Sequence, residues 1–249
     1  MGVQEEILAK VKEIPPLSTS ASQLMMLMGK PDRDFQETVK IVECDLGLTA
    51  KVLRVVNSTA FALMQPTTSI ARAVSYLEEK MVLGIALGAC TGSILRRPLK
   101  GYEGRSDALW EHNLMAAIAA RRVAGFAKEE VSADIAFTAG ILHDIGKAVL
   151  SEFMNGSAGD IVSKIDAGDA ADYISAEQEM LGMDHCTVGF EVARLWKLAG
   201  PLPEIIRFHH TPAKAEEEVR APVYAVHLGD IIAHKRTRSS IFGREDETS

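Results

Sequence analysis

Apolar side chains recur at intervals of three or four residues along most of this 249-residue chain. No segment alternates apolar and polar residues with the period of two that is typical of a strand. Three-to-four spacing places apolar side chains on one face of an α-helix, where they can be buried together. Apolar residues make up 47% of the chain, which is enough to build a core. The sequence therefore predicts an all-α fold.

Proline, glycine and capping residues divide this pattern into separate helices. Pro15-Pro16 ends the first helix, Asp34 is a candidate N-cap, and Thr67-Thr68-Ser69 offers further caps. The expected helices cover 3–13, 20–29, a segment starting near 35, 48–56, 70–80, 81–95, 106–127, 131–153, 158–166, 172–181, 184–198, 201–210 and 221–235.

The segment Gly101-Tyr102-Glu103-Gly104 is the best internal boundary. It predicts a helical lobe over 1–100 and a second one over 105–235, packed on a shared core. The polar residues 236–249 are expected to form a frayed tail. The whole of 14–235 can equally form one compact domain.

Composition and charge narrow the class of protein. The first six residues include two glutamates and no basic residue, whereas a signal peptide begins with a basic segment. The apolar stretch 81–95 is shorter than the roughly 18–20 residues that a membrane helix needs, so it predicts a buried core helix. Cys44, Cys90 and Cys186 show no C-x-x-C pairing, which favours reduced thiols in a cytoplasmic protein. The net charge of −7 argues against general binding of nucleic acid or an anionic membrane.

His143 and Asp144 form a polar pair inside the apolar segment Ile141–Lys147. Burying such a pair is costly without a partner, and a metal ion is one partner that removes the cost. Imidazole and carboxylate groups suit Fe or Mn and do not exclude Zn, Ni or Mg. Lys147 lies one helical turn past His143, where it could hold an anionic phosphate beside the metal. A single pair of this kind also occurs as an ordinary capping or core pair.

Other apolar helices supply further candidate ligands. Each has an ordinary explanation by itself: His112 and His185 as helix-start residues, His209 as a surface residue, Asp230 as a solvated one. Together they amount to five histidines and two aspartates, which is more than one ion usually takes and about right for two. The candidate ligands are His112, His143, Asp144, His185, His209, His210 and Asp230. The candidate catalytic residues are Lys147 and Asp144.

Two smaller features remain open. The face formed by Leu24, Met25, Leu27 and Met28 suits either a core or a docking surface. His227 and His234 flank Asp230 at one helical turn on either side, so they are either partners that orient the aspartate or ordinary helix positions.

Eight segments between residues 14 and 235 form a recognisable series: Ile14-Pro15-Pro16-Leu17, Asp45–Ser58, Thr68–Val74, Trp110-Glu111-His112, Ala139–Lys147, Gly182-Met183-Asp184-His185, Trp196-Lys197-Leu198 and His209-His210-Thr211-Pro212. In this order they resemble the HD superfamily of metal-dependent phosphohydrolases, and the chain more closely resembles its HDOD branch of bacterial signalling output domains. The resemblance covers about residues 14–235.

The resemblance implies an all-α fold and a signalling role in bacteria. It also implies a ligand set: His112, His143, Asp144 and Asp230 match the mononuclear HD motif, and His185, His209 and His210 match additional ligands of the HD-GYP cyclic-dinucleotide phosphodiesterases. The chain departs from HD-GYP proteins after His210, where Thr-Pro-Ala follows with no GYP segment. It departs from the usual HDOD pattern at 75–79, where Ser-Tyr-Leu-Glu-Glu replaces Leu-Gly.

Three functions fit these observations. The first is a regulatory signalling protein that carries a metal site and contacts other signalling proteins. The second is an active phosphohydrolase or phosphodiesterase, whose one or two ions act on a nucleotide, cyclic nucleotide or other small phosphorylated ligand. The third is an interaction module without metal.

Overall fold

The computed structural model describes residues 2–28, 30, 32–58, 61, 63–90, 95–102, 106–127, 131–154 and 172–242, with side chains up to Lys235. Helices account for the regular structure of these residues, and no β-strand occurs among them. The predicted all-α class is therefore confirmed. The predicted helix at 158–166 lies outside the described residues.

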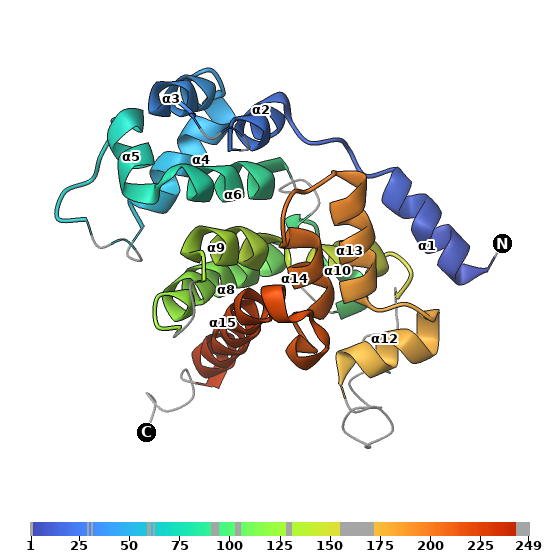
Figure 1. Cartoon of the computed structure of the whole chain (residues 1–249). Helices are drawn as coiled ribbons and strands as arrows, with labels where there is room; N and C mark the ends of the chain where they lie inside the picture. The colour runs from blue at the N-terminus through green and yellow to red at the C-terminus, as the bar shows by residue number, and fades with distance from the viewer. Residues whose placement is uncertain are drawn as a thin grey trace.

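Five helices from the first part of the chain lie together at the top of Figure 1. They are α2 (Thr19–Met28), α3 (Phe35–Glu43), α4 (Leu46–Val56), α5 (Ile70–Leu77) and α6 (Glu79–Cys90). Helix α6 is the predicted core helix, and its residues from Met81 to Gly88 are all buried. Among the described residues, no helix combines the length and the apolar character required to cross a membrane.

The remaining helices form a second group around a three-helix layer. In that layer α8 (Ala108–Ala124) packs against both α9 (Ala133–Leu142) and α15 (Glu217–Phe242). Around it lie η1 (Lys100–Tyr102), α10 (Ile145–Leu150), α12 (Tyr173–Leu181), α13 (His185–Leu195), α14 (Leu202–Phe208) and η2 (Pro212–Lys214).

The first helix packs on the second group. Helix α1 (Val3–Lys12) begins the chain but packs on α13 and α10, far along the sequence (Figure 1). Helix α6 packs on α9, and one buried apolar cluster includes side chains from both groups. The division into lobes at 1–100 and 105–235 stays a prediction.

The structure corrects two of the predicted helices. The expected helix 131–153 is interrupted: α9 ends at Leu142 and α10 begins at Ile145, so that His143 and Asp144 lie in the break. Apolar residues continue on both sides of the break, which is why periodicity cannot detect it. Helix α15 is longer than expected at both ends, and 236–242, predicted as part of a frayed tail, continue the helix.

The apolar face of α2 belongs mainly to the core. Leu24 and Leu27 are buried, and the half-buried Met25 and Met28 pack against the core, whereas Met26 is 65% exposed. The three cysteines are free, as predicted.

Asp45 caps helix α4 and provides a test of this part of the fold. Its carboxylate accepts the Leu48 amide at 3.0 Å and the Ser20 hydroxyl at 2.7 Å, and these bonds lower the pKa of Asp45. We expect Asp45→Ala to lower the free energy of unfolding by about 1 kcal/mol at pH 7, the usual loss for an N-cap. Because the folded-state pKa lies below the ordinary value, this contribution is present above pH ~4 and is lost as the pH falls through the folded-state pKa.

Urea denaturation of the wild-type protein and of Asp45→Ala at neutral and acidic pH measures the difference. Asp45→Asn is the matched control, because asparagine also caps helices and carries no charge. A difference between wild type and Asp45→Ala that stays constant as the pH falls below 4 would contradict the assignment.

Candidate metal centre

The structure brings all seven predicted ligands to one place in the second helix group. Helix α8 carries His112, and the break between α9 and α10 carries His143 and Asp144. His185 is the first residue of α13, and Asp230 lies within α15. His209 and His210 directly follow α14.

Asp144 lies at the middle of the cluster and faces histidines on two sides. Its Oδ2 atom is 3.6 Å from His112 Nε2 and 3.5 Å from His143 Nε2. Its Oδ1 atom is 3.4 Å from His185 Nε2 and 3.6 Å from His209 Nε2. The two oxygens of one carboxylate thus face two separate sets of nitrogen atoms.

Asp230 and His210 complete the two sides. Asp230 Oδ1 lies 3.0 Å from His112 Nε2 and 3.6 Å from His143 Nε2, on the Oδ2 side of Asp144. The His210 ring lies 4.2 Å from the His209 ring and 5.1 Å from the His185 ring, measured between centroids, on the Oδ1 side.

The donor atoms of this cluster fit metal ions. Buried polar atoms without a hydrogen-bond partner cost about 1–3 kcal/mol each, and six of them meet here. They are Nε2 of His112, His143, His185, His209 and His210, and Oδ1 of Asp144. Two ligands bound about 2.1 Å from one ion lie about 3.0–3.4 Å apart. The separations of 3.0–3.6 Å within the cluster are close to this range.

The other ring nitrogen of three histidines has an acceptor. His143 Nδ1 donates to the Gly140 carbonyl and His209 Nδ1 to the Ile206 carbonyl, both at 2.8 Å. His185 Nδ1 lies 2.7 Å from a carboxylate oxygen of Glu177. With the proton assigned to Nδ1 by these acceptors, the Nε2 lone pair of each ring points into the cluster, as metal-bound histidines require.

Charge in the cluster favours a cation. Burial opposes ionisation of Asp144, but the Lys147 ammonium and the surrounding histidines outweigh it and hold the pKa of Asp144 well below its usual range. Burial and the charges of His209 and His185 lower the pKa of His210 to about 2, which keeps this ring neutral. Burial also acts on His209, yet the charges of Cys186 and Asp144 raise its pKa to about 10. A proton or a metal ion is thus strongly favoured beside Asp144.

Lys147 contacts the cluster through Asp144. Its ammonium lies 2.6 Å from Asp144 Oδ2, one turn along α10. The predicted contact of Lys147 with a phosphate stays a prediction.

Two glycines permit α13 to pack closely against its neighbours α10 and α14. A β-carbon at Gly146 would clash with the His185 carbonyl, and one at Gly189 would lie 2.9 Å from Ile206 Cγ2. The close packing at Gly146 brings the start of α10 against the start of α13, which helps to place Asp144 next to His185.

Sequence reasoning did not identify Cys186 as a member of the cluster, and it left the role of His234 open. Cys186 belongs to a group with His185, His209 and His210, and His234 to a group with His112 and Asp230. Adjacency to His185 was the available signal for Cys186. His234 Nδ1 lies 2.9 Å from Asp230 Oδ1, in line with the orienting interpretation. His227 instead contacts the His209 carbonyl, so that interpretation is wrong for His227.

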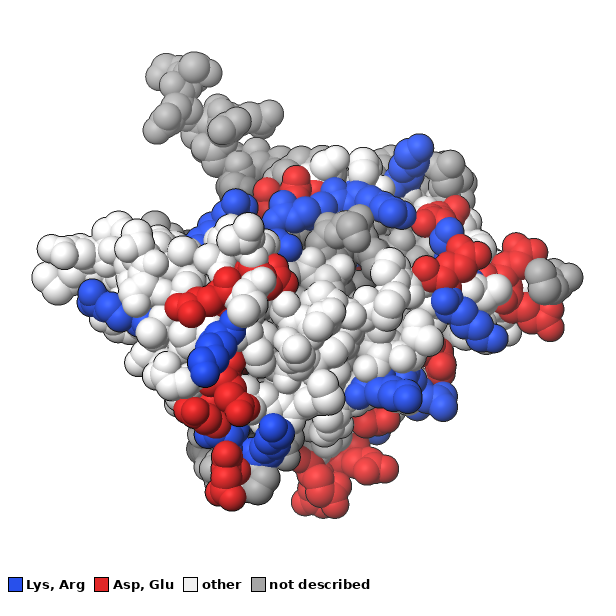
Figure 2. All heavy atoms as spheres, turned by 90° about the horizontal axis from the view of Figure 1, so that it is seen from above, with Lys and Arg blue, Asp and Glu red and all other residues white. Residues whose placement is uncertain are grey.

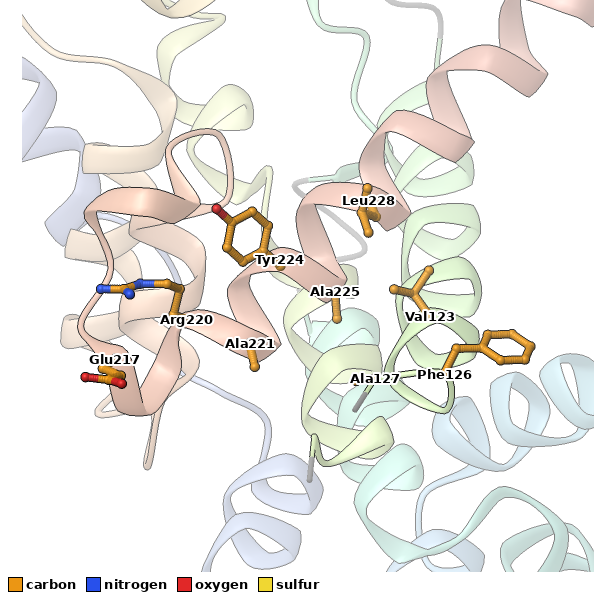
Figure 3. A pocket seen from close by; sticks show the side chains of 9 residues that line it. All are labelled: Val123, Phe126, Ala127, Glu217, Arg220, Ala221, Tyr224, Ala225 and Leu228. Atoms are coloured by element: carbon orange, nitrogen blue, oxygen red, sulfur yellow. The ribbon is translucent and has the colours of Figure 1, made fainter. Parts of the chain in front are cut away.

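A cavity of about 540 Å³ lies away from the cluster, between the end of α8 and the first half of α15. Figure 3 shows Phe126 and Val123 on one side of it and Tyr224 and Leu228 on the other. None of its nine lining residues is a candidate ligand.

The HDOD domain family matches residues 14–212 of this chain. The chain belongs to this family. An HDOD domain protein of unknown function from Geobacter sulfurreducens is 25% identical, with a TM-score of 0.72 over 94% of this chain and 79% of that one. The HDOD fold thus spans both helix groups described above.

Two other solved structures and one curated relative are also similar to this chain. A Shewanella amazonensis SB2B protein named as a putative phosphohydrolase is 24% identical, with a TM-score of 0.71 over 93% of this chain and 81% of that one. A Marinobacter aquaeolei VT8 protein named as a putative signal transduction protein is 23% identical, with a TM-score of 0.73 over 95% and 51%. An uncharacterized Treponema pallidum protein is 22% identical over 87% of this chain, which spans only 41% of that relative.

Proposed function

We propose that this HDOD chain is a bacterial signalling protein that holds two metal ions in its second helix group. One observation carries the proposal: six buried donor atoms without hydrogen-bond partners meet around Asp144. The ligands on one side are His112, His143 and Asp230, and on the other His185, His209 and His210, with Asp144 between them. The histidine-rich donor set with carboxylates suits Fe or Mn best, with Zn, Ni and Mg as alternatives.

The helices α2–α6 support the regulatory part of this proposal. They fill much of the first 100 residues and carry none of the seven candidate ligands. We propose that they serve contacts with other signalling proteins in the cytoplasm. On the face shown in Figure 2, basic side chains are mixed with acidic ones around a broad uncharged area. This mixture, with the net charge of −7, favours a protein or small-molecule partner over general nucleic-acid binding.

Elemental analysis tests the metal centre. Protein purified without chelator should contain close to two ions per chain, and His143→Ala and His185→Ala, one from each side, should each lose about one. Metal-free wild-type protein that also takes up no Mn²⁺, Fe²⁺ or Zn²⁺ would favour the interaction module without metal.

A phosphohydrolase is the second candidate, and the complete donor set with Lys147 favours it. Bound ions would supply a water of lowered pKa and polarise a phosphoryl oxygen. Lys147 lies against Asp144, where its charge can bind a phosphate oxygen of a nucleotide or cyclic nucleotide. Hydrolysis of cyclic di-GMP is not inferred from the family resemblance, because the GYP segment is missing.

We expect Lys147→Met to lower kcat on a responsive phosphoester by about 100-fold, the usual loss for one charge-stabilising group, and to retain both ions. A panel of bis(p-nitrophenyl) phosphate, nucleotides and cyclic nucleotides identifies the substrate. Failure of the metal-loaded protein to hydrolyse any of them would remove this second candidate and leave the regulatory one.

A further inference from the structure

Glu177 is a fully buried carboxylate on α12, a helix that carries none of the predicted ligands. Removing a carboxylate from water costs several kcal/mol, so a buried one persists only where other groups satisfy its charge and its oxygens. The groups around Glu177 therefore indicate what it is there to do.

Both oxygens of Glu177 face His185 or Tyr102. The His185 backbone amide donates to Oε2 at 2.7 Å, and His185 Nδ1 lies 2.7 Å from Oε2 and 3.0 Å from Oε1. The Tyr102 hydroxyl, from η1, donates to Oε1 at 2.7 Å. On the opposite edge of the His185 ring, Nε2 has no hydrogen-bond partner and lies 3.4 Å from Asp144 Oδ1.

The position of His185 explains why it needs a side chain from another helix. His143 and His209 follow helices, so the carbonyl three residues earlier accepts their Nδ1 proton. His185 is the first residue of α13 and has no preceding helical turn to supply such a carbonyl. Glu177 fills this role from α12, and it brings a full negative charge instead of a carbonyl dipole.

We propose that Glu177 is a positioning residue for the metal ion held by His185, His209 and His210, and that Tyr102 orients Glu177. The carboxylate fixes the ring angle of His185 and strengthens Nε2 as an electron-pair donor. This inference rests on the metal centre proposed above and extends it by selectivity: Glu177 supports one of the two ions. The ion beside His112, His143 and Asp230 does not depend on it.

Titration of metal-free protein with Mn²⁺ tests this selectivity. Glu177→Gln keeps the size of the side chain and removes its charge, and Glu179→Gln is the matched control at an exposed position of the same helix. We expect Glu177→Gln to weaken the binding of one of the two Mn²⁺ ions by about 10–100-fold, the usual effect of losing such a hydrogen-bond partner of a ligand. The affinity for the other ion should not change. Glu179→Gln should bind both ions like the wild type.

Equal Mn²⁺ binding by Glu177→Gln and wild type would overturn this inference and leave the metal centre standing. A wild type that binds no Mn²⁺ would overturn both. Equal weakening of the two ions would also contradict it, since it would show a general structural role. Should Glu177→Gln fail to fold, NMR of Zn²⁺-loaded wild-type protein gives the answer. A His185 Nδ1–H signal shifted downfield and protected from exchange supports the inference, and a rapidly exchanging one overturns it.

Discussion

Asp144→Ala should remove both metal ions, whereas His210→Ala should remove at most one. Asp144 is the one candidate ligand whose two oxygens face nitrogens on both sides, at 3.4–3.6 Å. His210 lies on one side only, next to His185 and His209. Elemental analysis of both purified variants, with circular dichroism to verify helix content, measures the effect.

Asp144→Asn serves as the control for shape. It preserves the size of the side chain but replaces one donor oxygen with an amide nitrogen that cannot bind a metal, so we expect it to lose at least one ion. An Asp144→Ala protein that retains two ions would show that the aspartate is a neighbour of the metal centre and not its bridge.

Removal of the metal should lower the thermal stability strongly. An ion present at 100 times its Kd stabilises the folded chain by about 2.7 kcal/mol. For a domain of this size 1 kcal/mol corresponds to about 2–4 °C in Tm, so we expect the loss of each ion to lower Tm by about 5–11 °C and chelation of both to lower it by about twice as much. The loss has a structural cause, because the buried Nε2 atoms then have no partner.

Thermal denaturation before and after chelation, followed by Mn²⁺ addition, measures this shift. Asp144→Ala is the control, since a protein without the ions should show no chelator effect. If the Tm of the wild-type protein is the same after chelation and after Mn²⁺ addition, the folded site binds no ion and the prediction is wrong.

Much of the fold follows from local sequence signals, and the exceptions have identifiable causes. The α2, α4 and α13 segments are evident from apolar spacing and from flanking proline, glycine or aspartate. The break at His143 and Asp144 is hidden, because apolar residues continue on both sides and the chain bends there to place two polar side chains. The packing of α1 on α13 is a long-range contact that helix periodicity does not encode.

The candidate site also contains residues that the sequence could predict and residues that it could not. The seven predicted ligands could be named from polar residues in apolar helices and from the resemblance to a family. Glu177 could not, because an acidic residue on a short helix is expected to be solvent-exposed, and its burial against His185 and Tyr102 is evident only in the structure. His234 was recognised as a neighbour of Asp230 because both lie on one helix. Residues that act from another helix are visible only in three dimensions.

Anomalous diffraction from a crystal of the Mn²⁺-loaded protein tests the central claim most directly. The account predicts two peaks, one among His112, His143 and Asp230 and one among His185, His209 and His210, with Asp144 between them. A single peak, or peaks elsewhere in the fold, would contradict it.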